Sequence, residues 1–162
     1  MTQLAQIPDA TALRLAMRCV AATVAVVTAR FGAELSGVTV TSATSVTMEP
    51  PTLLVCVNRS TRLNAIVQAS RRFEVNYLTA RHRDVAAAFG GGTAGDRFAV
   101  GQWDRTAPSP ALADALARLS CRLDETVECG THSIFMGRVE AVHLGDGEPL
   151  LYCQGDYAWL AA

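Results

Sequence analysis

Six hydroxyl side chains lie in the fifteen residues from Gly37 to Pro51, which read G-V-T-V-T-S-A-T-S-V-T-M-E-P-P. Short hydrogen-bonding side chains at the end of a strand can surround a flat polar ring, because they let backbone N–H groups approach it. The same residues also fit an edge strand followed by a Ser/Thr-rich turn, and composition alone favours this simpler interpretation. The stretch is therefore one candidate segment for binding a cofactor.

A second candidate is the segment C-V-N-R-S-T-R-L, from Cys56 to Leu63, which has the pattern of a strand end followed by a helix start. Hydroxyl groups, free N–H groups at a helix N-terminus and the guanidinium of Arg59 or Arg62 would together form a phosphate site. The alternative is an ordinary helix cap flanked by solvated arginines.

The composition excludes several kinds of chemistry. All 14 basic residues are arginine, so the chain has no lysine to form a Schiff base, to anchor pyridoxal phosphate or to serve in a P-loop. The net charge is -1 and no block of like charges occurs. The charge therefore gives no reason to expect nucleic acid or an anionic membrane as a partner.

Cysteine and histidine give no sign of a metal site. The five cysteines contain no C-x-x-C pair, and the three histidines do not cluster with them as zinc ligands would. We expect the cysteines to be small buried hydrophobic residues. The N-terminal residues lack the pattern of a signal peptide, and no apolar run is long enough for a membrane helix. These features predict a cytoplasmic protein that contacts no membrane.

The spacing of apolar residues predicts short helices and many strands. Asp9 is expected to cap an opening helix, Ser60 or Thr61 a helix that ends at Gln68, and Thr79 a helix that ends at Phe89. Residues 90–110 should form a long surface loop. Strands are expected at residues 23–28, 37–41, 52–57, 73–77, 119–127, 133–142 and 150–152, with a hairpin at Gly145-Asp146-Gly147 joining the last two.

Six or seven strands with few short helices predict an antiparallel barrel, closed or partly closed. The strands do not alternate with long helices, and a G-x-G-x-x-G fingerprint is missing, so a doubly wound nucleotide-binding sheet is not expected. No linker or internal repeat interrupts the sequence. We therefore expect residues 1–162 to form a single domain.

In their order and spacing, these segments resemble the flavin reductase-like family, the small NAD(P)H:flavin oxidoreductases that supply reduced flavin to two-component flavin monooxygenases. The resemblance implies a flavin-binding split β-barrel with antiparallel Greek-key strands and a few short peripheral helices. The matching pieces are V-A-V-V-T (24–28), the two stretches above, R-F-E-V-N-Y-L (72–78), D-R-F (96–98), T-H-S-I-F-M-G-R-V (131–139) and G-E-P-L-L-Y (147–152).

The resemblance also implies which residues bind the flavin, FMN or alternatively FAD. One segment lies along the ring and the ribityl chain with backbone amides as donors, a second receives the phosphate, and a third contacts the flavin from the long loop and makes Arg97 a further phosphate ligand. In that order, the residues are Thr39, Val40, Thr41, Ser42, Ala43, Thr44 and Ser45; Cys56, Val57, Asn58, Arg59, Ser60, Thr61 and Leu63; and Asp96, Arg97 and Phe98.

His132 resembles the histidine that lies near the nicotinamide in this family, and it is the candidate catalytic residue. Tyr152, Cys153 and Gln154 are implied to flank the same pocket. The simpler interpretations are a structural histidine and a last core strand. Two positions depart from the family. Thr131 stands where Asp is frequent, which puts the orientation of the His132 ring in question, and Ala43 stands where many members carry a larger residue, which would open the flavin face.

The implied reaction is hydride transfer from the nicotinamide C4 of NADH or NADPH to flavin N5, followed by release of reduced flavin. The lack of a motif for the 2′-phosphate slightly favours NADH. The implied partners are a second copy in a homodimer and a flavin-dependent monooxygenase. Two alternatives remain open, namely a split-barrel protein that holds flavin or haem tightly for another redox step, and a flavin-binding module without turnover.

Overall fold

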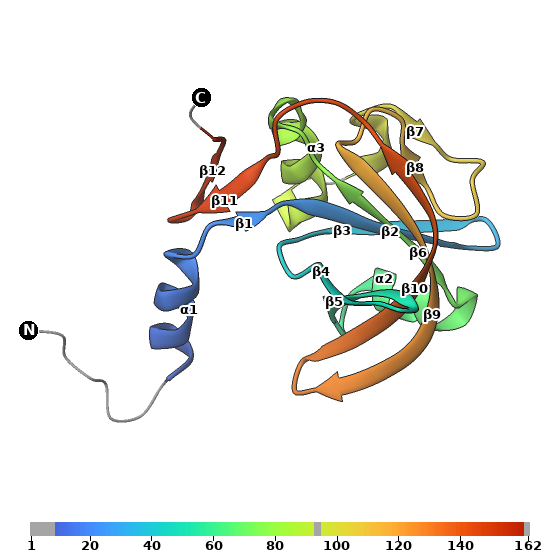
Figure 1. Ribbon diagram of the computed structural model, residues 1–162, viewed down its shortest axis with the longest axis horizontal. Helices are drawn as coiled ribbons and strands as arrows, with labels where there is room; N and C mark the ends of the chain where they lie inside the picture. Colours follow the sequence, from blue (N-terminus) through green and yellow to red (C-terminus); the bar gives the residue numbers. More distant parts are fainter. Residues whose placement is uncertain (1–8, 93–94, 161–162) are drawn as a thin grey trace, which may run out of the picture.

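A seven-stranded antiparallel sheet forms the centre of the computed structural model, which describes residues 9–92 and 95–160 (Figure 1). All neighbouring strands in this sheet are antiparallel, which confirms the predicted mainly β fold. From one edge to the other, the strands are β3 (Glu34–Val40), β2 (Ala25–Phe31), β6 (Arg72–Tyr77), β9 (Ala117–Cys129), β10 (His132–Leu144), β5 (Pro51–Asn58) and β4 (Thr44–Met48).

The sheet curls because its two edge strands are joined directly. Only residues 41–43 separate β3 from β4, and so short a connection spans at most about 14 Å when fully extended. Two register shifts along the β9–β10 pair add to the curvature, since bulges bend the strands that carry them. Among the described residues no ladder pairs β3 with β4, so the sheet forms a split barrel that is not closed.

Apolar side chains fill the inside of this barrel. Gly137 of β10 lets the ring of Phe73 lie directly against the backbone, where a Cβ atom would overlap the ring. Helix α2 (Arg62–Ser70) packs Ile66 and Val67 into the same core, and Thr61 caps it as predicted. The other central members of this core are Val27, Leu53, Val55, Val57, Leu63, Val75, Leu123 and Phe135.

A second apolar cluster lies on the opposite face of β2 and holds the predicted long loop. The rings of Phe89, Phe98 and Trp103 pack with centroids 5.0–5.3 Å apart. Phe98 and Trp103 thus anchor residues 95–112 against the body of the domain. The helix predicted from Thr79 is divided into η1 (Ala80–His82), α3 (Arg83–Ala87) and η2 (Ala88–Gly92), and the loop contains η3 (Arg97–Ala99), β7 (Trp103–Asp104) and β8 (Ala111–Leu112).

The hairpin predicted at Gly145-Asp146-Gly147 is wrong. Strand β11 (Leu151–Cys153) pairs with β1 (Ala22–Thr23) and β12 (Asp156–Ala158) in a separate small sheet, and it does not pair with β10. Gly145 donates its N–H to the carbonyl of Leu116 (2.9 Å), and a bridge between Thr79 and Pro149 then carries the chain across the domain. These long-range hydrogen bonds outweigh the local preference of Asp-Gly for a tight turn.

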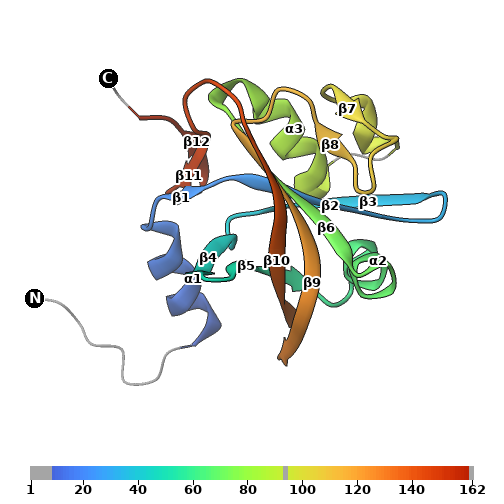
Figure 2. The same cartoon turned by 45° about the vertical axis from the view of Figure 1, so that its right-hand side comes forward.

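Helix α1 (Ala10–Arg18) forms where it was predicted, since the Asp9 carboxylate accepts a hydrogen bond from the Ala12 N–H (2.6 Å). None of its residues is buried. It stands apart from the seven-stranded sheet in Figure 1, whereas in the turned view of Figure 2 it lies beside the edge strand β4 in projection. In the described part of the chain, no helix is long and apolar enough to cross a bilayer.

The expectation of uniformly buried cysteines is also wrong. Only Cys121 is buried, whereas Cys19 and Cys129 are exposed and Cys56 and Cys153 are partly exposed. Burial raises the pKa of the Cys121 thiol to about 12. Apolar neighbours in the sequence therefore did not predict whether a cysteine is buried, because successive residues of a strand point to opposite faces of the sheet.

Glu74 of β6 is a carboxylate buried on the outer face of the sheet, with 4% of its surface exposed. Burial raises its pKa above the ordinary value of 4.5, and the Ser120 hydroxyl and the Arg118 guanidinium offset part of this increase. A raised pKa means that the folded state favours the protonated form. Ionisation therefore opposes folding, and its cost grows as the pH rises from about 4.5 to the higher pKa of Glu74 in the folded protein, above which the cost is complete.

We expect Glu74→Gln to raise the free energy of unfolding at neutral pH, because the amide carries no charge to desolvate. The gain should shrink as the pH falls from the raised pKa of Glu74 in the folded protein toward 4.5, and it should be lost below 4.5, where both folded and unfolded wild-type chains are protonated at this position. Urea unfolding at several pH values measures the difference. The exposed Glu148→Gln serves as the control and should change stability by less than about 0.5 kcal/mol. A gain that persists at low pH would contradict this account.

Candidate functional site

Asn58 organises the turn from β5 into α2. Its side-chain oxygen accepts hydrogen bonds from the N–H (2.9 Å) and the hydroxyl (2.8 Å) of Ser60. Its backbone carbonyl accepts the hydroxyl of Thr61 (2.7 Å), and the Thr61 hydroxyl oxygen in turn accepts the N–H of Asn64 (3.3 Å). Residues 58–61, Asn-Arg-Ser-Thr, therefore fold into a turn that fixes where helix α2 begins.

A pocket of about 410 Å³ opens beside this helix start. Thr61 and Arg62 line one side, where the first N–H groups of a helix lack intrahelical partners and attract anions. Ser36 and Gly37 of β3 and Arg97 of the long loop line the rest. The pocket thus joins a helix N-terminus, hydroxyl groups and a guanidinium, which are groups that bind phosphate.

The three candidate arginines differ in their partners. Arg59 pairs with Glu128 (3.2 Å) and Arg62 pairs with Glu34. Arg97 makes no ion pair among the residues that the structure describes. Of the three, the guanidinium of Arg97 is the one available to an incoming anion without breaking an existing pair.

The neighbours of Arg97 hold it in position. The carboxylate of Asp96 accepts the Phe98 N–H (3.0 Å) and pairs with Arg105 (2.9 Å). Phe98 is buried in the aromatic cluster. Asp96 and Phe98 therefore fix the short turn that presents Arg97 to the pocket.

The hydroxyl-rich stretch divides into structural and available groups. Thr39 donates its hydroxyl to the Ala86 carbonyl (2.7 Å), and Ser42 exchanges hydrogen bonds with the N–H and carbonyl of Cys56. These bonds hold the end of β3 against β5 and α3. Thr41, Thr44 and Ser45 are exposed, Ala43 packs partly on the core, and Val40 lies within it.

His132 begins β10 and lies directly opposite Asn58 in the sheet. Its Nδ1 is 2.9 Å from the hydroxyl of Thr131. The threonine that replaces the expected aspartate therefore still contacts the imidazole. Next to it, a second pocket of about 510 Å³ is lined by Asn58, Arg59, Ser60, Gly130 and Thr131.

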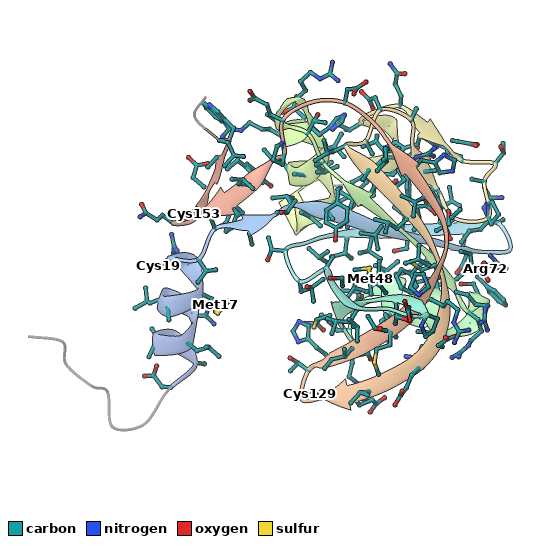
Figure 3. The ribbon with its side chains drawn as sticks, viewed as in Figure 1. Met17, Cys19, Met48, Arg72, Cys129 and Cys153 are labelled. Atoms are coloured by element: carbon teal, nitrogen blue, oxygen red, sulfur yellow. The ribbon has the colours of Figure 1, made fainter. Side chains whose placement is uncertain are left out.

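The structure does not bring every predicted residue to these pockets. Tyr152, Cys153 and Gln154 lie on β11 and its turn, far from the β9–β10 turn that carries Cys129 and His132 (Figure 3). The side chains of Val57 and Leu63 are buried in the core, so only their backbone groups are available to a ligand.

Some pocket residues were not predicted from the sequence. Ser36 and Gly37 line the phosphate-sized pocket, and Gly37 has no room for a side chain because a Cβ atom would lie 2.8 Å from the Phe89 ring. Glu128 fixes Arg59. Gly37 begins the hydroxyl-rich motif, which was the one sequence signal for this part of the pocket.

The antiparallel split barrel carries a pocket at the start of α2 and a histidine at the adjacent strand end. A helix N-terminus with a nearby guanidinium suits a phosphorylated ligand, so the fold and the pocket together define a class of small β-barrel proteins with a candidate anion site at the barrel rim. Comparison with known families agrees, since the model of the flavin reductase like domain matches residues 17–161. The chain belongs to the flavin reductase-like family.

Individual relatives and structures are similar over most of their length. An FMN reductase (NADH) RutF of Bradyrhizobium diazoefficiens is 40% identical over 142 residues, which cover 86% of this chain and 79% of the relative. The 4-hydroxyphenylacetate 3-monooxygenase reductase component of Pseudomonas aeruginosa is 39% identical over 150 residues, covering 90% and 88%. The structure of the NADH:FAD oxidoreductase SgcE6 of Streptomyces globisporus C-1027 superposes with a TM-score of 0.90 at 30% identity, covering 100% and 99%. The same enzyme has been solved in complex with NAD and FAD fragments.

Proposed function

We propose that this protein is a flavin reductase that uses NADH to reduce FMN. The observation that carries the proposal is the pocket in which Arg97, free of any ion pair in the described structure, faces Thr61 and the N-terminus of α2. This donor set fits a flavin phosphate. The relatives named as FMN reductases that use NADH, and the neighbour solved with NAD and FAD fragments, support the choice of cofactors.

The protein's part in the reaction is to bind and orient, since the nicotinamide and the flavin together supply hydride transfer. The helix start, Thr61 and Arg97 would hold the phosphate, and the exposed hydroxyls and backbone of residues 41–45 would lie along the ring. His132, steadied by Thr131, would position the nicotinamide at the adjacent rim. No titrating group has to act as an acid or base in this scheme.

The direct test is the oxidation of NADH by the purified chain, followed by absorbance, with and without added FMN. We expect turnover that depends on FMN, and NADPH in place of NADH serves as the comparison. The absence of flavin-dependent turnover with either nucleotide would refute the proposal. Protein that stays yellow after desalting would show that the flavin is held tightly and is not exchanged.

Arg97→Met should weaken FMN binding by about tenfold or more, because it removes a charge-assisted hydrogen bond to the phosphate. Riboflavin, which has no phosphate, should bind the variant and the wild type equally. Fluorescence titration of each flavin measures both affinities. Arg81→Met, a change to an exposed arginine that lines neither pocket beside α2, is the matched control. An equal loss for riboflavin would show that Arg97 acts on the fold and does not contact the phosphate.

His132→Ala should lower kcat/KM for NADH by about tenfold, equivalent to about 1.4 kcal/mol of transition-state stabilisation. The affinity for FMN should not change. Thr131→Val should give a smaller loss in the same direction, because the imidazole stays but loses its 2.9 Å contact. His143→Ala, at the other end of β10, should have no effect. Steady-state kinetics with varied NADH measures kcat/KM for each variant. An unchanged kcat/KM for His132→Ala would show that His132 does not contribute to the nicotinamide site.

We also propose that reduced flavin passes to a flavin-dependent monooxygenase. The support is the relative in Pseudomonas aeruginosa, which is named as the reductase component of a monooxygenase. The cytoplasm is the compartment we propose, because all five cysteines are free thiols, as is usual in a reducing environment.

Two copies of the chain are proposed to pair as a homodimer. Leu13 and Met17 of α1, and Val20 just after it, are exposed apolar residues at helical spacing. An apolar groove of about 180 Å³, whose lining includes Tyr77 and Val142, opens on the sheet with further exposed apolar residues beside it. An exposed apolar helix face and an exposed apolar groove are the features that a symmetric partner covers.

Met17→Glu should shift the pair toward monomers, raising the dissociation constant by about tenfold or more, because it places a charge in the proposed interface. The monomer fold should be unaffected, since α1 has no buried residue. Thr11→Glu, on the opposite face of the same helix, is the control. Size-exclusion chromatography with light scattering measures the mass. A wild-type monomer at micromolar concentration would contradict the homodimer.

A further inference from the structure

A pocket of about 310 Å³ lies outside the flavin site, between strands β6 and β9 and the loop 104–111. It shares no lining residue with the pockets beside α2. Its rim includes Arg72, on the side of the molecule away from helix α1 (Figure 3). The proposed reductase activity makes no use of this pocket.

Two opposite charges face this pocket without contacting each other. Glu74 is 4% exposed and Arg118 is half-buried. In the sheet, Glu74 lies opposite Ser120, and Arg118 lies opposite Asn76, so the two charged residues are diagonal neighbours on one face, about 7–8 Å apart along the backbone. Within the described ranges, neither forms an ion pair with any residue.

A third polar group also lacks a partner. Ser109 is 5% exposed, lines the pocket, and its hydroxyl makes no hydrogen bond in the structure. A buried hydroxyl without a partner costs free energy. Such a group at the wall of a pocket points to a ligand that would satisfy it.

The other charges at the pocket already have partners or lie in solvent. Asp104, which also faces Arg118, accepts hydrogen bonds from Thr106 and the Ala107 N–H. Arg72 pairs with Glu140 (2.9 Å), and His143 is exposed at the rim. The Ser120 hydroxyl and the Arg118 guanidinium offset only part of the cost of burying Glu74. Glu74, Arg118 and Ser109 are therefore the groups that a ligand could still satisfy.

We propose that this pocket binds a small zwitterion, an α-amino acid with an apolar side chain. The ammonium donates to Glu74, and the carboxylate accepts from Arg118 and from the Ser109 hydroxyl. The two charges of an α-amino acid lie close together, as the two diagonal neighbours Glu74 and Arg118 require of a ligand that pairs with both. Ala107 and Pro108 supply an apolar wall for the side chain.

A ligand with one charge does not meet the same requirements. An amine would leave Arg118 unpaired and place a second cation beside it. A carboxylic acid would bring an anion beside the buried Glu74. Only a group that carries both charges pairs both residues at once, which is why the geometry points to a zwitterion.

The first experiment is calorimetric titration of the flavin-free full chain with L-leucine at mildly alkaline pH, which favours the ionised form of Glu74. We expect saturable binding at one site per chain. The matched probes are 4-methylpentanoate, which lacks the ammonium, and 3-methylbutylamine, which lacks the carboxylate. Each should bind at least about tenfold more weakly. No saturation by leucine in the millimolar range, or equal binding of a single-charge probe, would overturn the proposal.

Variants test the assignment of the residues. Glu74→Gln and Arg118→Met should each weaken leucine binding by about tenfold or more, and Ser109→Ala by less. Arg122→Met, on the same strand but outside the pocket, should bind leucine like the wild type. Circular dichroism and NADH oxidation with FMN report whether each variant is folded. Unchanged leucine affinity in folded Glu74→Gln and Arg118→Met would overturn the site, and this outcome is independent of whether the protein reduces flavin.

Discussion

The pairing of β5 with β10 is the constraint on which the candidate flavin site depends. The register of this pair sets His132 opposite Asn58. Just beyond the two strands, the Arg59 N–H donates a hydrogen bond to the Thr131 carbonyl (2.9 Å). The turn that starts α2 and the turn that ends β9 are therefore held together. A slip of one residue would turn the buried Val55 and Val57 outward. Burial of the core thus fixes the geometry of a site at the surface.

Local sequence patterns predicted the elements that carry their own signals. Asp9 and Thr61 start helices where their side chains can cap N–H groups, and the alternating strands β2, β5 and β6 lie close to their expected positions. Strand β4 was not predicted, because all five of its residues are exposed and show no alternation. It forms through pairing with β5, an interaction that its own sequence does not reveal.

The parts of the site that escaped prediction depend on contacts between distant segments. Ser36 and Gly37 line the pocket because Phe89 packs against Gly37, and the two segments are far apart in sequence. The residues around His132 show a different limit of prediction from residue type. The change from aspartate to threonine at position 131 predicted a weakened orientation of the ring, yet the hydroxyl lies within hydrogen-bonding distance. Residue type alone did not show that a shorter side chain reaches the same nitrogen.

Strand β6 shows how one sheet serves two sides of the molecule. Phe73 and Val75 face the barrel core, while Glu74 and Asn76 face the loop that covers the outer side. Asn76 holds this loop, because its side-chain oxygen accepts the N–H of Leu112 in the loop (2.8 Å). Its side-chain NH₂ group donates to the Val26 carbonyl in the sheet (3.0 Å).

The Thr28 hydroxyl donates a further hydrogen bond from the sheet to the same loop, to the Pro110 carbonyl. The loop is therefore fastened without Glu74. The Ser120 hydroxyl and the Arg118 guanidinium offset only part of the cost of burying the ionised carboxylate, so its pKa stays raised. Structural support does not explain a carboxylate at this position, whereas a ligand that donates to it does.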